Sequence, residues 1–224
     1  MFFGQHKDIV CLANSQKPLS NNPYVTGGHC VAGRSNAGWI RPVSAAAETG
    51  ALSLQEINLG NNSEPRLLDI IRVPVLRQRP EYAQPENWLI APNKAWRKIG
   101  QFDRRNIARL LERPATLWEN AGGKNDRVSV VSLQATPPQA SLYLIQPTDL
   151  IVHHVVRSTG NPQIRATFVY NQFSYDFVVT DPIAKERYLG MGVGQYNLPP
   201  ATVLCISLGE AFKGDHYKLV AAVI

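Results

Sequence analysis

The stretch DPIAKERYLG, residues 181–190, decides the fold class of this chain. Asp181 is suited to cap the first turn of a helix, and Pro182 to occupy its first position. Gly190 is suited to end that helix. We therefore expect a short helix here, set between two groups of strands.

Strand-like runs lie on both sides of this helix. They combine β-branched and aromatic residues and are bounded by Gly, Pro, Asn or Asp. Three runs precede the helix and two follow it, at 149–157, 163–170, 172–180, 203–208 and 217–224. Three strands, a helix and two strands is the order of the OB-fold, a five-stranded barrel. A generic β-sandwich does not need a helix at that point.

The first half of the chain is expected to follow the same plan. Its strand-like runs lie at 8–13, 29–34, 39–43, 67–76 and 87–90. A short helix is expected within 45–59, and strands expected around 128–133 and 142–145 find no place in the scheme. The predicted fold class is mainly β, with two OB-like small β-barrels and a connecting α-helix.

The connecting helix is expected at about 102–113, with Asp103 as its N-cap and Pro114 as its stop. Apolar residues recur on one of its faces and arginines on the other, at four-residue steps. The arginines are Arg105, Arg109 and Arg113, which either face solvent or form a basic ridge toward phosphates. The expected domains are 1–120, the first barrel with the linker helix, and 121–224, the second barrel.

Composition narrows the function classes. The 224 residues carry a net charge of +6, which favours polyanions as partners. No apolar run is long enough to span a membrane, and the first residues do not form a signal peptide, so we expect a cytoplasmic protein. The three cysteines are scattered and have no metal-binding spacing, so we expect neither a metal nor a cofactor.

Five motifs connect the sequence to a known family. They are KDIVCLANSQK (7–17), HCVAGRSNAGWIRPVS (29–44), QPENWLI (84–90), FVVTDP (177–182) and CISLGEAFKGDHYKLVAAVI (205–224). Together and in this order they resemble the bacterial dual OB-domain-containing proteins. The resemblance implies two OB barrels and, by analogy with other OB-folds, oligonucleotide binding. OB barrels also bind sugars and proteins, so the ligand stays open.

In the first barrel, Trp39 and Arg41 are expected to share one face of a strand. Because an arginine is hard to bury without a partner, we expect this face to be partly exposed, with Arg34 nearby at the turn. Base stacking with phosphate binding is one interpretation of these residues. A structural cation–π contact or ion pair is the other.

In the second barrel, the strands at 163–170 and 172–180 carry alternating aromatic residues, the phenylalanines of which we expect in the core. Tyr170 and Tyr175 tolerate water, so they are placed either in the core or on a stacking surface. Arg165 and Lys213 are expected to contact phosphates, Lys213 from the loop between the last two strands.

The function predicted from these patterns is non-catalytic binding of single-stranded or structured DNA or RNA. One alternative is a protein–protein interaction module of a bacterial defence or mobile-element system. Another is a small-ligand enzyme that uses Asp181, Glu210 and Lys218 as a polar site. Dinucleotide, P-loop and nucleophile-elbow motifs do not occur in the sequence.

Overall fold

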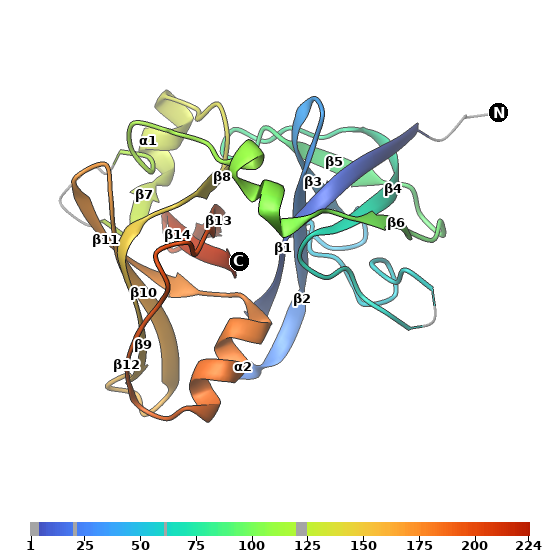
Figure 1. Cartoon of the computed structure of the whole chain (residues 1–224). Helices are drawn as coiled ribbons and strands as arrows, with labels where there is room; N and C mark the ends of the chain where they lie inside the picture. Colours follow the sequence, from blue (N-terminus) through green and yellow to red (C-terminus); the bar gives the residue numbers. More distant parts are fainter. Residues whose placement is uncertain (1–4, 20–21, 61, 120–124) are drawn as a thin grey trace. The chain divides into compact units, whose positions relative to one another are not determined.

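The chain forms two compact units, Met1–Leu110 and Leu111–Ile224, which we call unit 1 and unit 2. The computed structural model describes residues 5–19, 22–60, 62–119 and 125–224 (Figure 1), and the side chains of 17–26 are not among them. Each unit has its own sheet and its own apolar core. The domain boundary predicted between 120 and 121 lies outside the described residues.

Unit 2 is a closed barrel. Its elements are β7 (Arg127–Ser129), α1 (Val130–Ala135), β8 (Leu142–Ile145), β9 (Thr148–Val156), β10 (Pro162–Tyr170), β11 (Phe173–Val179), α2 (Pro182–Gly190), β12 (Gly194–Asn197), β13 (Leu204–Phe212) and β14 (Asp215–Val223). Neighbouring strands follow the order β9–β10–β11–β14–β13–β8. Only Gln146 and Pro147 separate β8 from β9, so the two act as one bent strand that closes the ring. The five-stranded OB order is confirmed.

The helix α2 forms after β11, as the stretch 181–190 predicts, and the short strand β12 separates it from β13. The Asp181 carboxylate accepts hydrogen bonds from the backbone N–H groups of Ile183 at 2.9 Å and Ala184 at 3.2 Å. Its second oxygen accepts from the Val223 N–H at 2.9 Å and thereby ties the helix to β14. The helix includes Gly190, and the left-handed turn after it falls on Gly192, at φ 90°.

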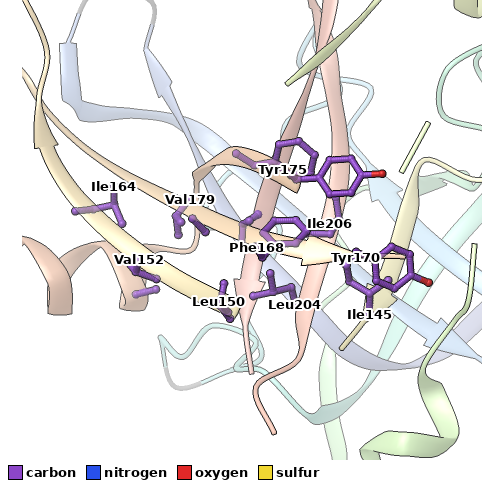
Figure 2. Packing of buried hydrophobic residues seen from close by; sticks show 14 of the residues in the cluster. Ile145, Leu150, Val152, Ile164, Phe168, Tyr170, Tyr175, Val179, Leu204 and Ile206 are labelled. Atoms are coloured by element: carbon purple, nitrogen blue, oxygen red, sulfur yellow. The ribbon is translucent and has the colours of Figure 1, made fainter. Parts of the chain in front are cut away.

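The core of unit 2 follows from strand alternation. In β10 every second residue from Ile164 to Tyr170 is buried, while the residues between them are half-exposed. Figure 2 shows Phe168, Tyr175 and aliphatic residues of several strands in one cluster. Phe177 is fully buried there, whereas Phe173 is 53% exposed. The prediction of phenylalanines in the core is therefore right for Phe168 and Phe177 and wrong for Phe173, which lies at the first position of β11.

Unit 1 is a second barrel with the same strand order. Its elements are β1 (Gln5–Leu19), β2 (Asn22–Ser35), β3 (Gly38–Val43), β4 (Asp69–Gln78), β5 (Asn87–Ile90), β6 (Arg97–Gln101) and the 3₁₀ helix η1 (Arg104–Leu110). The strands pair in the order β1–β2–β3–β5–β4, and β4 also pairs with β1 and closes the ring. β3 and β5 are parallel, and β6 adds to β4 outside the ring.

The helix expected within 45–59 does not form, because the chain there pairs with β2 instead. Leu52 exchanges backbone hydrogen bonds with His29, at 2.7 and 2.9 Å. Leu52 and Ile57 are fully buried and supply core volume from this extended loop. An extended pairing at Leu52 is incompatible with helical backbone angles over the same residues.

The segment that connects the units also differs from its prediction. Within 102–113, where we expected an α-helix, the chain forms the shorter 3₁₀ helix η1. None of its residues is buried, so no packed apolar stripe stabilises an α-helix there. Of the two further strands predicted in unit 2, the one at 142–145 is β8. The strand predicted at 128–133 is wrong from Val130 onward, where the chain forms α1, and only its first two residues belong to β7.

Candidate nucleic-acid interface

Trp39 and Arg41 in β3 are buried, so the expected exposed face is absent. Their exposed fractions are 8% and 5%. Arg41 Nε donates a hydrogen bond to Glu86 Oε1 at 3.2 Å, and Glu86 is itself buried. The partner carboxylate comes from the turn before β5, 45 residues along the chain. The expectation of exposure is wrong because Glu86 makes burial of the Arg41 charge tolerable.

Arg34 at the end of β2 is half-buried beside the indole of Trp39. Its guanidinium carbon lies 5.7 Å from the Trp39 ring centroid, within the range of a cation–π contact. The structural interpretation of this pair, rather than base stacking, therefore agrees with the geometry.

Tyr170 and Tyr175 in unit 2 are core residues, with exposed fractions of 8% and 7%. The Tyr175 ring lies 5.5 Å from the Phe168 ring and 5.3 Å from the Phe177 ring, between centroids. Its hydroxyl accepts a hydrogen bond from the Leu117 N–H at 3.2 Å. Neither tyrosine ring presents a face on which a base can stack, so this part of the predicted surface is wrong.

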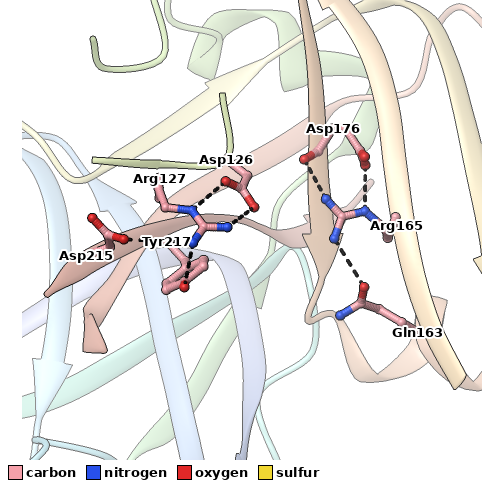
Figure 3. A network of polar contacts seen from close by, with 7 residues as sticks. All are labelled: Asp126, Arg127, Gln163, Arg165, Asp176, Asp215 and Tyr217. Carbon is pink, nitrogen blue, oxygen red and sulfur yellow. Dashed lines mark hydrogen bonds and ion pairs between the residues drawn. The ribbon is translucent and has the colours of Figure 1, made fainter. Parts of the chain in front are cut away.

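Arg165 lies on the outer face of β10, but its charge is already paired. It donates to Asp176 Oδ1 at 2.8 Å, to the Asp176 carbonyl at 2.9 Å and to Gln163 at 3.1 Å. A second arginine, Arg127, forms a similar set of contacts with Asp126 and Tyr217 (Figure 3). The charges of Arg165 and Arg127 are therefore neutralised by carboxylates within unit 2.

The pairing of Arg127 also acts on its neighbour. Hydrogen bonding to the Arg127 guanidinium holds the pKa of the Asp126 carboxyl below its usual value, although partial burial opposes this effect. Asp126 is therefore ionised at neutral pH and keeps Arg127 in place. A phosphate must displace this carboxylate before it can use both charged hydrogen bonds of Arg127.

The β13–β14 hairpin presents an exposed aromatic ring beside a cation. Phe212 is 54% exposed, and Lys213 Nζ lies 5.5 Å from its ring centroid. The Tyr217 ring follows at 6.4 Å from that of Phe212, and Arg127 lies over Tyr217 at 4.5 Å. The sequence predicted Lys213 but missed Phe212, whose position next to a Lys-Gly turn was the available signal.

Positive charge is divided unequally between the units. Residues 1–110 contain 14 Lys or Arg and 8 Asp or Glu, whereas residues 111–224 contain 9 of each. The whole net charge of +6 therefore belongs to unit 1, and unit 2 is neutral. Because long-range attraction of polyanions depends on net charge, unit 1 is the part of the chain that attracts them.

Much of this charge lies on β4, β6 and η1. Arg72 of β4 is directly opposite Arg97 of β6 in the strand register. We call the basic strip the set Arg72, Arg77, Arg97, Lys98, Arg104 and Arg109, all of which are exposed. Arg72 is paired with Asp8 and Lys98 with Asp69. The other four have no ion pair within the described part of the chain, whereas Arg105 in η1 is held by Asp103.

The three polar residues proposed for a small-ligand enzyme do not form one site, because Asp181 lies far from Lys218. Asp181 is occupied as the cap of α2 and bonds Val223 on β14. Lys218 is 1% exposed, and its Nζ donates to the Trp118 carbonyl at 2.6 Å. Lys218 and Val223 are five residues apart on β14, which corresponds to about 16 Å. The site around Asp181, Glu210 and Lys218 is therefore wrong, and no group of His, Cys, Asp and Glu in the described residues could hold a metal.

The sequence matches the family model of the dual OB-containing domain over residues 7–223. The chain belongs to the dual OB-containing domain family. The motif resemblance is thereby confirmed, and the two rings of five strands described above are the two OB barrels of this dual OB protein.

Solved structures similar to the dual OB protein include the p204 HINb domain and the tetrameric p202 HIN2. The first is 11% identical, covers 100% of both chains and has a TM-score of 0.33. The second is 10% identical, with a TM-score of 0.31 and coverage of 98% of this chain and 92% of the other. Similarities this low carry no argument about function. No curated protein matches the chain.

In the part of the chain that the structure describes, helices long and apolar enough to cross a membrane are not found.

Proposed function

We propose that this dual OB protein is a non-catalytic nucleic-acid-binding protein whose phosphate contacts come mainly from unit 1. The observation that carries the proposal is the confinement of the net charge of +6 to unit 1, together with four strip arginines that lack an ion pair in the described structure. Arginines in this state can neutralise phosphates, and so release the counterions condensed on the nucleic acid, without first breaking a salt bridge. The OB barrels supply an architecture that commonly holds oligonucleotides.

The proposed contacts differ from the residues predicted by sequence. Arg109 stays in the interface as part of the basic strip, whereas Arg105 and Arg165 first have to leave Asp103 and Asp176. Phe212 and Lys213 replace the buried tyrosines as the proposed stacking element. The protein partner, the cytoplasmic location and the choice between DNA and RNA stay predictions without further support.

The first test removes charge from the basic strip. The double variant Arg77→Ala/Arg97→Ala should bind a 20-nucleotide single strand more weakly and with a smaller dependence on salt. Two lost phosphate contacts should reduce the slope of log K against log salt by about 1.4. Fluorescence anisotropy with the full chain at five salt concentrations measures both quantities.

A matched control comes from unit 2. Arg157→Ala/Arg187→Ala removes two exposed arginines from the neutral unit and should leave the slope unchanged. Equal losses for both double variants would place the interface elsewhere. Absence of binding by the parent protein, even at the lowest salt, would overturn the proposed function itself.

The second test concerns stacking at the β13–β14 hairpin. Phe212→Ala should weaken binding by about 1–3 kcal/mol without changing the salt slope, because a ring contributes contact with bases and no charge. Phe173→Ala is the control, since Phe173 is 53% exposed and Phe212 54%. If the two variants bind with the same affinity, Phe212 has no special role. Anisotropy on the same oligonucleotide measures the difference.

A further inference from the structure

Unit 2 contains a pocket, with apolar walls and several polar groups, that the proposed phosphate and stacking contacts do not use. It lies where β8 bends into β9, beside the turn that joins β10 and β11 and the segment that follows β12. Its volume is about 820 Å³, within the range of small-ligand sites. Pro147, Pro199 and Pro200 contribute flat apolar wall, and Tyr170, Asp149 and Arg113 contribute hydrogen-bonding groups.

Tyr170 is the strongest sign that the pocket accepts a polar ligand. The residue is more than nine-tenths buried, and its hydroxyl points away from the apolar cluster (Figure 2). The Asn171 amide lies close by, yet no described group forms a hydrogen bond of normal geometry with this hydroxyl. A buried hydroxyl without a partner is costly, and a ligand with a hydrogen-bonding edge removes that cost.

The other polar groups define the chemistry of the ligand. The Asp149 carboxylate has neither a hydrogen bond nor an ion pair to any described residue, and Arg113 is exposed at the same pocket. With Glu112, which accepts a hydrogen bond from the Leu144 N–H, the ionisable side chains of the wall sum to −1. A phosphate or a peptide carboxylate is therefore disfavoured, and a neutral ring with both donors and acceptors is favoured.

We propose that this pocket binds a guanine base of the bound nucleic acid. Guanine donates two parallel N–H groups that suit the Asp149 carboxylate, and its O6 and N7 accept from an arginine such as Arg113. The Tyr170 hydroxyl supplies the third polar contact, and the prolines pack against the ring. This inference rests on the proposed function for its biological ligand, while the test uses nucleosides without phosphate.

The experiment follows amide resonances of the full chain during titration with guanosine, inosine, adenosine and cytidine. Guanosine should bind about tenfold more tightly than adenosine or cytidine. Inosine lacks the 2-amino group of guanine and should bind more weakly than guanosine. Equal binding of the four nucleosides, or no binding, would overturn the proposal. Because OB barrels also bind sugars, maltose is a competitor, and displacement of guanosine by maltose would overturn the proposal as well.

Variants assign the contacts. Asp149→Asn keeps a residue that tolerates the positive φ of 51° and removes the carboxylate. This variant should bind guanosine about tenfold more weakly and show a smaller preference for guanosine over inosine. Tyr170→Phe should also lower the affinity for guanosine. Glu186→Gln, which removes an exposed carboxylate on α2, should not change it. A guanosine affinity that is the same in all variants would contradict the site.

Stability measurements separate loss of binding from loss of folding. Tyr170→Phe removes a hydroxyl without a partner and should leave the unfolding midpoint unchanged or higher. Tyr175→Phe removes an acceptor for the Leu117 N–H and should lower the midpoint. If Tyr170→Phe lowers it as much, the hydroxyl is already satisfied and the inference fails.

The two proposals fail in different ways. Guanosine carries no phosphate, so Arg77→Ala/Arg97→Ala should not change its affinity. If the protein binds guanosine but no oligonucleotide, the guanine pocket is supported and the proposed function is overturned. If the protein binds oligonucleotides with no preference for guanine, the proposed function is supported and the guanine pocket is overturned.

Discussion

Glu86→Ala should lower the free energy of unfolding by about 3–5 kcal/mol, because it removes the carboxylate that pairs with the buried guanidinium of Arg41. Both side chains are about 6% exposed, so water cannot replace the lost carboxylate. Chemical denaturation of the full chain, followed by tryptophan fluorescence, measures the effect, since three of the four tryptophans, Trp39, Trp88 and Trp96, lie in unit 1.

The double variant Arg41→Met/Glu86→Leu should recover most of that loss. Apolar side chains of similar volume remove the charge and its partner together, so neither is left unsatisfied. Asp8→Ala is the matched control, because the Asp8–Arg72 pair lies on the same barrel with both side chains more than 40% exposed. It should leave the midpoint unchanged. If the double variant is as unstable as Glu86→Ala, the ion pair is not the reason for the loss.

Lys218 should make unit 2 more stable as the pH rises above 8. Burial lowers the pKa of its ammonium from 10.5 to about 8, and the charge of Asp126 opposes only part of this shift. Between these values the folded protein releases the proton before the unfolded chain does, so the unfolded state binds more protons and stability increases with pH. The full gain is about 3 kcal/mol and is reached above the pKa of the unfolded chain.

Lys218→Met isolates this contribution. Other lysines and the tyrosines titrate in the same range in both proteins, so the difference between the two stability curves belongs to Lys218. From pH 7 to pH 10 the parent should gain about 2–3 kcal/mol relative to the variant. Urea unfolding at four pH values measures the difference. Parallel curves would mean that Lys218 reaches water, in contrast to its exposed fraction of 1%.

Local patterns in the sequence were sufficient for the order of the strands and for α2. Asp181 and Pro182 define the start of that helix through neighbouring atoms, which sequence spacing reports directly. The chain between β3 and β4 was beyond such reasoning, because its shape depends on Leu52 pairing with His29, 23 positions earlier in the sequence. Propensity for a helix there is overridden by a tertiary contact.

The candidate site was harder to predict for the same reason. Alternation placed Trp39 and Arg41 on one face, yet the carboxylate that allows Arg41 to be buried lies 45 residues away. Alternation also grouped Tyr170 and Tyr175 with core phenylalanines without showing which face of each strand is the inner one. The unequal charge of the two units was readable in the sequence once a boundary near residue 110 was known.

The bent strand formed by β8 and β9 has a consequence for the order of folding. β8 pairs with β13, so that Leu142 lies opposite Ser207, and β14 fills the place between β11 and β13. The barrel of unit 2 therefore cannot close until β14 has been synthesised. The strands that pair in this barrel are distant in sequence, which slows folding. The strands of unit 1 are complete by Gln101, so unit 1 can fold while unit 2 is still being synthesised.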